Sequence, residues 1–294
     1  MKLEPECVGC FFNQIMKALR LLNNEITKED IINTQKKFMD YLISIDIKEV
    51  EAPLIGKKAY ELIAEVLNCL DPYSALKRHT NELALQHYDE VKEIVLNSED
   101  PLFHSIIVSA LANTIDFASQ HEIELISDLI KFDPKRLVIN DYINFNISIK
   151  NADYLLIIGD NSGEIVFDKL LIEIIQKCYP RLEIIYAVRS VAVINDATME
   201  DAEFIGLDKI VEVIKSGPTP GVNLDTATEE FKKYFFMKNT VILSKGQGNF
   251  ESLYGLDLPD QDLFYLFMAK CNLIERILKV RIGDLILKKK SARF

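Results

Sequence analysis

The feature that most constrains the fold of this chain is a change of hydrophobic pattern near residue 140. Beyond it, short apolar runs rich in β-branched residues alternate with stretches of helical periodicity. Nearly every residue in these runs is apolar, which is typical of parallel strands covered on both faces. We therefore expect an α/β fold with a mostly parallel sheet and helices packed on each side. The expected strands are residues 154–158, 182–188, 210–214 and 241–243.

The segment between the first two of these strands predicts a crossover helix. Residues 165–179 have an apolar helical face long enough to pass back over the sheet, and Pro180 favours an end to the helix. Strand, helix and strand then make one βαβ unit.

The first part of the chain has a different spacing of apolar residues. Up to about residue 135, apolar residues recur at spacings of three and four, as in the segment 11–22, which indicates amphipathic helices. Thr27 followed by Asp30 predicts a helix start through a capping box. Because no Gly/Ser-rich linker or internal repeat separates the two parts, we expect a helical N-terminal subdomain (residues 1–135) and an α/β portion (residues 136–294) that pack as one unit.

The charge of the chain argues against nucleic acid as a partner. Lys plus Arg number 34 and Asp plus Glu number 45, for a net charge of -11, which repels a phosphate backbone unless basic residues are segregated. The dense basic run from Lys288 to Lys290 is interpreted as a solvated end of the chain.

The sequence also lacks the features of a membrane or secreted protein. It has no run of about 18 apolar residues, and its first residues lack the apolar core of a signal peptide. Five cysteines, an odd number in a long chain, do not suggest a disulfide framework. We therefore expect a cytoplasmic protein with a small-molecule partner and no membrane partner, and the oligomeric state stays open.

Polar clusters follow three of the expected strands. In open α/β sheets, ligands bind beyond the carboxyl ends of the strands. The clusters are residues 159–164 after the first strand, Arg189 to Asn195 and Asp196 after the second, and residues 244–251 after the last.

Three residues of these clusters suit a divalent cation. Asp160 and Asn161 offer oxygen ligands directly after the first strand, and Asp196 after the next strand can converge on the same point. Mg²⁺ and Mn²⁺ bind such oxygens and keep waters that a substrate phosphate can replace. Asp160 and Asn161 are equally suited to turning the chain and capping the helix near Ile165, so this alternative stays open.

The same loops can hold a phosphate. Gly163 lets the backbone approach an anion at the N-terminus of the next helix. Lys245, followed by two nearby glycines, can place a positive charge beside the phosphate, although a surface lysine past a strand end would look the same. The expected catalytic residues are Asp160, Asp196 and Lys245. The expected substrate contacts are Ser162, Gly163, Glu164, Arg189, Asn195, Lys245, Gly246 and Asn249.

Cys7 and Cys10 form a separate motif. Two thiols three residues apart can share a metal or form a redox pair, and they can equally be buried, inert thiols. A structural zinc needs two further ligands, and Cys271 is the one other cysteine in a plausible motif.

Taken together, these motifs carry a family resemblance. Over nearly its whole length, the sequence resembles the archaeal and bacterial branch of the damage-control phosphatase family. The matching motifs are Cys7-x-x-Cys10; Asp71-Pro72-Tyr73 with Lys77 and Asn81; Asn113 with Asp116-Phe117; Gly159-Asp160-Asn161 through Asp168; Asn195-Asp196-Ala197-Thr198 with Asp201; and Lys245-Gly246-Gln247-Gly248-Asn249-Phe250-Glu251.

The resemblance implies a three-layer αβα sandwich beside an N-terminal helical bundle, and metal-dependent hydrolysis of phosphomonoesters. In the family, the metal ligands are an Asp-Asn pair after one strand and the Asp of an Asn-Asp pair after the next. These positions fall here on Asp160, Asn161 and Asp196. The lysine of the late Lys-Gly motif, here Lys245, is the implied phosphate contact.

We therefore expect a phosphatase of sugar phosphates or damaged metabolites that uses Mg²⁺, Mn²⁺, Co²⁺ or Ni²⁺, with water or Asp160 as the nucleophile. Two other functions stay open. One is an S-adenosylmethionine-dependent carboxyl methyltransferase, an activity also proposed for eukaryotic relatives of the family. Asp160 and Asn161, in place of a run of glycines at the strand end, argue against it. The other is a metal- or metabolite-binding protein without turnover.

Overall fold

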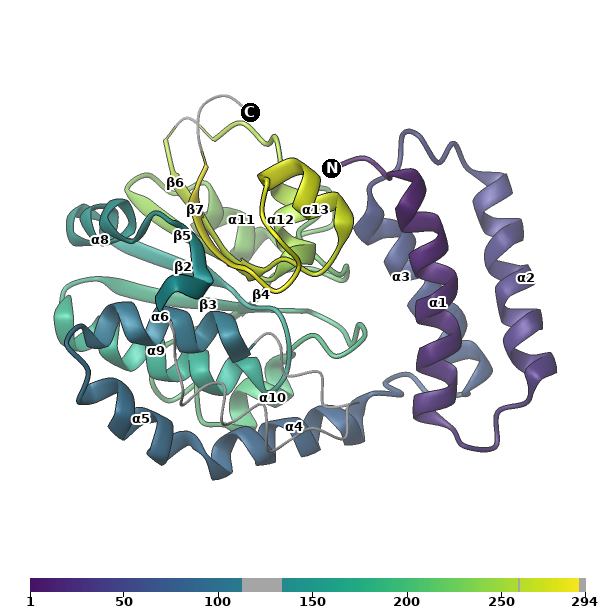
Figure 1. The fold of residues 1–294 in the computed structure, drawn as a ribbon, viewed down its shortest axis with the longest axis horizontal. Helices are drawn as coiled ribbons and strands as arrows, with labels where there is room; N and C mark the ends of the chain where they lie inside the picture. The colour runs from purple at the N-terminus through teal and green to yellow at the C-terminus, as the bar shows by residue number, and fades with distance from the viewer. Residues whose placement is uncertain (113–133, 259, 291–294) are drawn as a thin grey trace.

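A computed structural model describes residues 1–112, 134–258 and 260–290 of the chain. It contains a central sheet with helices on both faces and a group of helices beside one end of the sheet, at the right of Figure 1. This arrangement confirms the expected α/β class with a three-layer sandwich.

The described strands form one seven-stranded sheet. Their bounds are β1 (Leu137–Asn140), β2 (Tyr154–Ile158), β3 (Glu183–Val188), β4 (Glu212–Lys215), β5 (Thr240–Lys245), β6 (Asp262–Met268) and β7 (Leu285–Lys289). The order is β1-β7-β6-β5-β2-β3-β4, and the five strands from β6 to β4 in this order are parallel. The chain builds outward from β2 to β4 and then places β5 on the other side of β2, so a topological switch point lies between β2 and β5.

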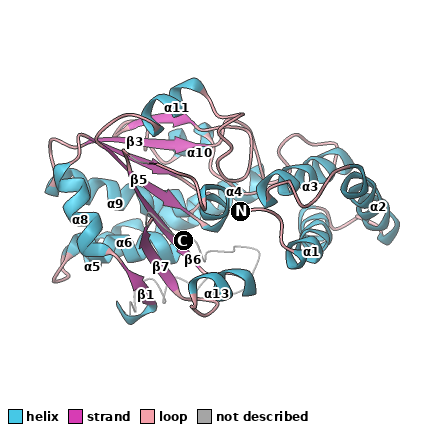
Figure 2. Ribbon diagram, turned by 90° about the horizontal axis from the view of Figure 1, so that it is seen from above, coloured by secondary structure: helices cyan, strands magenta, loops and turns pink. Residues whose placement is uncertain are grey.

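Helices cover both faces of this sheet (Figure 2). On one face lie α4 (Ser74–Gln86), α5 (Tyr88–Leu96), α6 (Pro101–Ala112), α8 (Tyr142–Asn151), α9 (Glu164–Cys178) and α10 (Met199–Phe204). On the other face lie α11 (Glu229–Phe235), α12 (Gln247–Leu253) and α13 (Asn272–Leu278). A short 3-10 turn (Pro134–Arg136) precedes β1. None of the described helices is long and apolar enough to cross a membrane.

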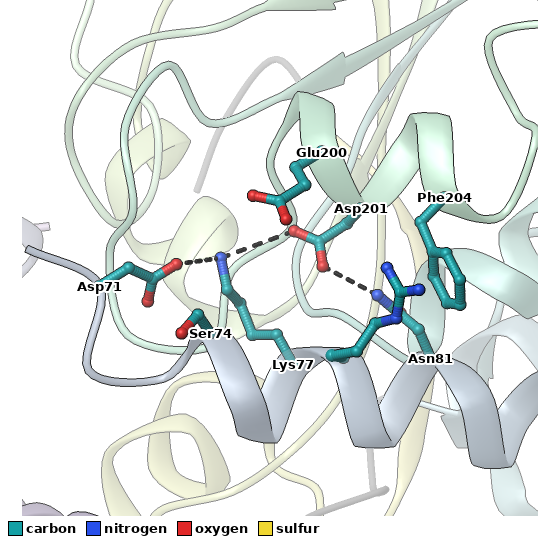
Figure 3. Close-up of a pocket in the computed structure, with 8 residues that line it drawn as sticks. Asp71, Ser74, Lys77, Asn81, Glu200, Asp201 and Phe204 are labelled. Carbon is teal, nitrogen blue, oxygen red and sulfur yellow. Dashed lines mark hydrogen bonds and ion pairs between the residues drawn. The ribbon is translucent and has the colours of Figure 1, made fainter.

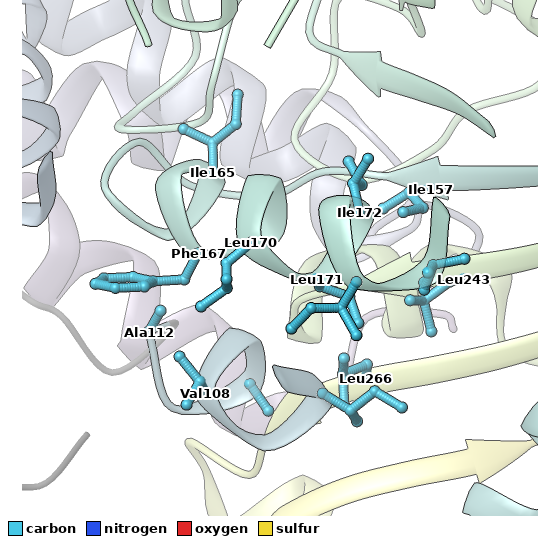
Figure 4. Close-up of a cluster of buried hydrophobic side chains, with 14 of the residues drawn as sticks. Val108, Ala112, Ile157, Ile165, Phe167, Leu170, Leu171, Ile172, Leu243 and Leu266 are labelled. Atoms are coloured by element: carbon cyan, nitrogen blue, oxygen red, sulfur yellow. The ribbon is translucent and has the colours of Figure 1, made fainter. Parts of the chain in front are cut away.

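The two faces of the sheet explain why the strand sequences are apolar throughout. In β2, Leu155 and Ile157 point into one core, and Leu156 and Ile158 point into the other, because successive side chains alternate between faces. Helix α9 packs its apolar side chains over the first face, where Leu171 is fully buried (Figure 4).

The expected elements correspond closely to part of this sheet. The expected strand at residues 154–158 coincides with β2. Those at residues 182–188, 210–214 and 241–243 correspond to β3, β4 and β5 with shifted ends. The expected crossover helix at residues 165–179 is α9, one residue out of place at each end.

Strands β1, β6 and β7 were outside the expected set, and β7 corrects one interpretation. Lys288 and Lys289 belong to β7 and not to a solvated tail. The ammonium of Lys289 lies 2.7 Å from Oδ1 of Asp262 in the neighbouring strand. The basic run was misread because a strand whose last residues are charged resembles a solvated segment in sequence.

The helices before residue 135 divide into two packing groups. Helices α1 (Pro5–Leu22), α2 (Lys28–Ser44) and α3 (Ala52–Val66) bury their own core. Thr27 and Asp30 form the expected capping box at the start of α2, with the Asp30 N–H donating to Oγ1 of Thr27 at 3.1 Å. Helices α4 to α6 instead contribute to the core under the sheet, so part of the described N-terminal region belongs to the sandwich.

The core placement predicts the effect of Leu171→Ala. The change removes apolar contacts and leaves a cavity, so we expect the free energy of unfolding to fall by about 2–5 kcal/mol. Ile147→Ala, at a side chain of α8 that is 56% exposed, is the control and should change this free energy by less than about 0.5 kcal/mol. Urea denaturation measures both variants, and equal losses would contradict the described packing.

Candidate metal and phosphate site

The loops after β2 and β3 lie side by side and pair through their backbones. Asn161 and Asp196 form an isolated antiparallel β-bridge. The N–H of Ala197 donates to the carbonyl of Asp160 at 2.7 Å. The structure therefore brings the three predicted metal ligands together at the carboxyl edge of the sheet, beside the switch point.

The exposure of these three side chains suits a ligand that approaches from outside. Asp160 and Asn161 are partly exposed, whereas the next three residues are buried. Nδ2 of Asn161 donates to Oδ2 of Asp160 at 2.9 Å. Asp196 is buried, and its Oδ2 accepts from Nε of Arg189 at 2.6 Å, whereas no hydrogen bond within the described residues takes its Oδ1. Two carboxylates and one amide fit a hard cation that keeps some of its waters.

The electrostatics of the pair also favour a cation. Burial raises the pKa of Asp196 to about 6, an effect that Arg189 opposes and the neighbouring Asp160 carboxylate increases. The increase arises because two negative charges in a poorly hydrated site repel each other. A positive ion between them would remove this repulsion.

Two findings bear on whether the loop after β2 caps a helix or binds a metal ion. The N-cap of α9 is Gly163, and no side chain caps the helix, so Asp160 and Asn161 do not serve as its caps. In the part of the chain that the structure describes, no group of three or more His, Cys, Asp or Glu side chains is arranged to hold a metal ion. The predicted ligands include only two such side chains, Asp160 and Asp196, because the third ligand is the amide of Asn161.

Arg189 and Asn249 tie the ends of three strands together. Besides its ion pair, the buried guanidinium of Arg189 donates to the carbonyl of Gly221 at 3.1 Å and to Oδ1 of Asn249 at 2.9 Å. Nδ2 of Asn249 donates to the carbonyls of Gly159 and Lys245, at 3.0 and 2.7 Å. Both residues thus hold the loops in place, and their contact with substrate stays a prediction.

The backbone near the site adopts two uncommon conformations. Gly246 has a φ of 78°, and a side chain at this position would collide with the carboxylate of Asp160. Ile194 has a φ of 50°, which is rare for a β-branched residue and is typical of strain at functional sites. Next to it, Asn195 accepts at its carbonyl a hydrogen bond of 2.9 Å from the N–H of Ser162.

Lys245 lies beneath the loops and not at the surface. Its side chain is fully buried, with Nζ at 2.5 Å from Oε1 of Glu164, 2.5 Å from Oδ1 of Asp168 and 2.7 Å from Oγ of Ser109. Burial lowers the pKa of Lys245, but Asp168 and Glu164 raise it beyond its usual value, so the ammonium is charged. Burial also raises the pKa of Glu164 to about 7. The surface-lysine alternative is therefore wrong, and contact with phosphate stays a prediction.

Helix α4 brings side chains of the N-terminal region to the same edge. Oδ1 of Asn81 accepts from the N–H of Gly163 at 2.6 Å, and its Nδ2 donates to Oδ1 of Asp201 at 2.8 Å. The hydroxyls of Thr80 and Ser162 share a hydrogen bond of 3.1 Å. The N–H of Gly163, a residue predicted to contact the substrate, is thus engaged by Asn81.

Several residues of this site were not among the predicted ones. Asp168 could have been found, because it is an acidic residue one turn after Glu164, between apolar residues of the predicted crossover helix. Ser109 gave no local signal, since its partners are far away in the sequence. Asn113 and Asp116, which belong to the motifs of the resemblance, lie outside the described residues.

A cavity of about 460 Å³ lies beside the loop after β5. Its walls include Gly248 from that loop and Ile194 from the loop before the Asp196 ligand. Cys7, Cys10 and Cys271 all line it, and burial raises the pKa of the Cys7 thiol. The three cysteines therefore line one cavity, and a metal or redox role for them stays a prediction.

The fold and these loops define a class of protein, namely doubly wound α/β proteins with an oxygen-rich ligand site at the switch point of the sheet. A more specific assignment follows from comparison with known sequences. The chain belongs to the family described as the damage-control phosphatase ARMT1-like domain, whose model matches residues 3–286. This match confirms the resemblance seen in the sequence.

Relatives in three archaea match the chain over almost its full length. It is 33% identical to an uncharacterized protein of Methanocaldococcus jannaschii, over 99% of this chain and 96% of that protein. It is 31% identical to a damage-control phosphatase of Pyrococcus horikoshii, over 97% of each chain. It is also 31% identical to a damage-control phosphatase of Archaeoglobus fulgidus, over 98% of this chain and 99% of that protein.

The fold is similar to a crystal structure of a protein from the same family. This structure, of a DUF89 family protein from Pyrococcus horikoshii, has a TM-score of 0.85 and 27% sequence identity, and the match covers 99% of this chain and 100% of that one. The likeness includes the N-terminal helices as well as the sheet, since nearly every residue is covered.

The buried position of Lys245 predicts that Lys245→Met is strongly destabilising. The change leaves Glu164 and Asp168 buried without a counter-charge, so we expect the free energy of unfolding to fall by about 3–5 kcal/mol. Lys92→Met breaks an ion pair with Glu173 at a partly exposed position, and should cost about 0–1 kcal/mol. Urea unfolding compares the two variants, and similar losses would contradict a buried Lys245.

Proposed function

We propose that this protein is a divalent-metal-dependent phosphatase that hydrolyses small phosphomonoesters, such as sugar phosphates or damaged phosphometabolites. The observation that carries the proposal is the backbone pairing of the loops after β2 and β3, which brings the backbones of Asp160, Asn161 and Asp196 next to one another. Homologues that bear the name damage-control phosphatase support the reaction class.

The residues Asp160, Asn161 and Asp196 would hold the cation, which we expect to be Mg²⁺, Mn²⁺, Co²⁺ or Ni²⁺. Such an ion, when bound, neutralises charge on the phosphate oxygens and orients the phosphate. The protein contributes rigid ligands, because Arg189 holds Oδ2 of Asp196 at 2.6 Å and leaves Oδ1 for the cation. The mutual repulsion of the two carboxylates adds a further preference for a bound cation.

In the proposed reaction, water is added across the bond between phosphorus and the ester oxygen, which gives an alcohol and inorganic phosphate. Gly246 lets the loop after β5 lie against the carboxylate of Asp160, which restricts the orientation of that side chain. Asp160 would then either direct a water molecule or attack phosphorus itself. Detection of an aspartyl phosphate during turnover distinguishes these two routes.

The cavity beside the loop after β5 is the proposed site for the organic part of the substrate. Its volume of about 460 Å³ is within the range of small-molecule sites. Its walls combine apolar side chains such as Phe11 and Pro220 with polar ones such as Gln14. Because α1 and α3 form one side of it, the N-terminal helices would select the substrate.

The metal ligands predict a loss of activity in Asp160→Asn and Asp196→Asn. Each change removes a negative oxygen from the cation site but keeps the side-chain shape, so we expect turnover to fall by at least about 100-fold in a folded protein. Chelation of the cation should abolish turnover in the wild type, and added metal should restore it. The exposed Asp225→Asn is the control. Phosphate release from a panel of phosphomonoesters is the measurement, and full turnover in Asp160→Asn would reject the assignment.

The cavity predicts a size-dependent effect of Cys10→Phe. A phenyl ring at Cys10 would occupy the cavity, so the KM for naphthyl phosphate should rise by about tenfold, whereas the KM for glycerol phosphate should change much less. Cys178→Phe, at the exposed end of α9, is the matched control. A proportionate rise for both substrates in Cys10→Phe would place the organic part of the substrate elsewhere.

A further inference from the structure

The buried cations around the candidate site differ in how fully their N–H groups are used. Nζ of Lys245 has four acceptor atoms within 3.2 Å, from Ser109, Glu164 and Asp168, which exceeds the three protons of an ammonium. The Arg189 guanidinium has a partner at each of its three nitrogens, which uses three of its five N–H groups. Neither cation can turn toward a substrate without giving up a buried contact.

Lys77 keeps most of its hydrogen-bonding capacity. Its residue is only 4% exposed, and its Nζ lies 2.7 Å from Oδ2 of Asp71. Asp201 is farther away, at 3.6 Å, and its oxygens already accept hydrogen bonds from Thr198 and Asn81. Within the described residues, this ammonium therefore has one close partner for three protons.

Lys77 borders a small pocket between α4 and α10 (Figure 3). The pocket has a volume of about 20 Å³, enough for about one water molecule. Asp71 and Asp201 lie on either side of the ammonium, and Ser74 and Glu200 also line the space. A cation with unused protons next to a polar opening is poised to exchange one partner for another.

Lys77 is also near the predicted metal ligands. Its Nζ lies 3.6 Å from Oδ2 of Asp201, and this oxygen also accepts hydrogen bonds from the N–H and the hydroxyl of Thr198, two residues after Asp196. One turn further along α4, Thr80 and Asn81 contact the loop that carries Asp160. Helix α4 is thus fixed on this loop by two hydrogen bonds, with Lys77 beside the other ligand loop.

We propose that Lys77 binds the substrate phosphate at the site of Asp160 and Asp196, an inference that rests on the phosphatase function proposed above. Its flexible four-carbon stem allows the ammonium to leave Asp71 and donate to the phosphate oxygens. A phosphate dianion attracts an ammonium more strongly than one carboxylate does, because it carries more charge on more acceptor atoms. Lys245, in this view, remains buried beneath the loops.

Titration of inorganic phosphate into the Mg²⁺-loaded protein tests this role. Lys77→Met keeps the apolar stem and removes the charge, so we expect the Kd for inorganic phosphate to rise about 10- to 100-fold. Binding of Mn²⁺ in the absence of phosphate should not weaken, since Lys77 is not a metal ligand. Lys37→Met, which removes a lysine from an exposed pair with Glu65, is the control and should leave both Kd values unchanged.

Asp71→Asn provides a second test with the opposite sign, and it decides the matter if Lys77→Met does not fold. Asn can keep the hydrogen bond that the N–H of Tyr73 donates to Asp71, while the charge that competes for Lys77 is lost. This variant should bind inorganic phosphate at least as tightly as the wild type. Weaker binding in Asp71→Asn, or wild-type binding in Lys77→Met, would overturn the inference. A wild-type protein that neither binds phosphate nor turns over any ester with the four cations would instead refute the proposed function.

Discussion

The structure of the site depends on one interaction, the backbone pairing between the loops that follow β2 and β3. The bridge between Asn161 and Asp196 places acidic and amide side chains from two strands next to one another. The pairing is possible because β2 and β3 are parallel neighbours in register, so that both loops start at the same edge of the sheet.

Bringing these carboxylates together has an electrostatic cost, and buried cations offset it. Arg189 pairs with Asp196, while Lys245 lies between Glu164 and Asp168 one layer below. Buried charges of this kind contribute little net stability, but they penalise any arrangement that leaves one of them unpaired. They therefore fix the position of the loops.

The sequence located the strands nearest the site well, whereas it missed the strands β6, β7 and β1 on one side of the sheet. Residues 154–158 are apolar throughout because both faces of β2 are covered, which is a local and strong signal. Strand β6 is equally apolar, but its Phe, Leu and Met residues also suit a buried helix. Strand β1 is only four residues long, and β7 is antiparallel to its neighbour β6. Neither strand therefore has the sequence pattern of a long buried parallel strand.

The sequence by itself determined which oxygens follow the strands, because Asp160, Asn161 and Asp196 come directly or shortly after apolar runs that can only be buried. Tertiary structure decided the direction in which each cation points. Lys245 turns under the loop because Asp168 is one helical turn beyond Glu164, and Lys77 reaches the same edge because α4 packs against the start of α9. Contacts between residues that lie so far apart along the chain leave no periodic pattern in the sequence, since they depend on how whole helices pack on the sheet.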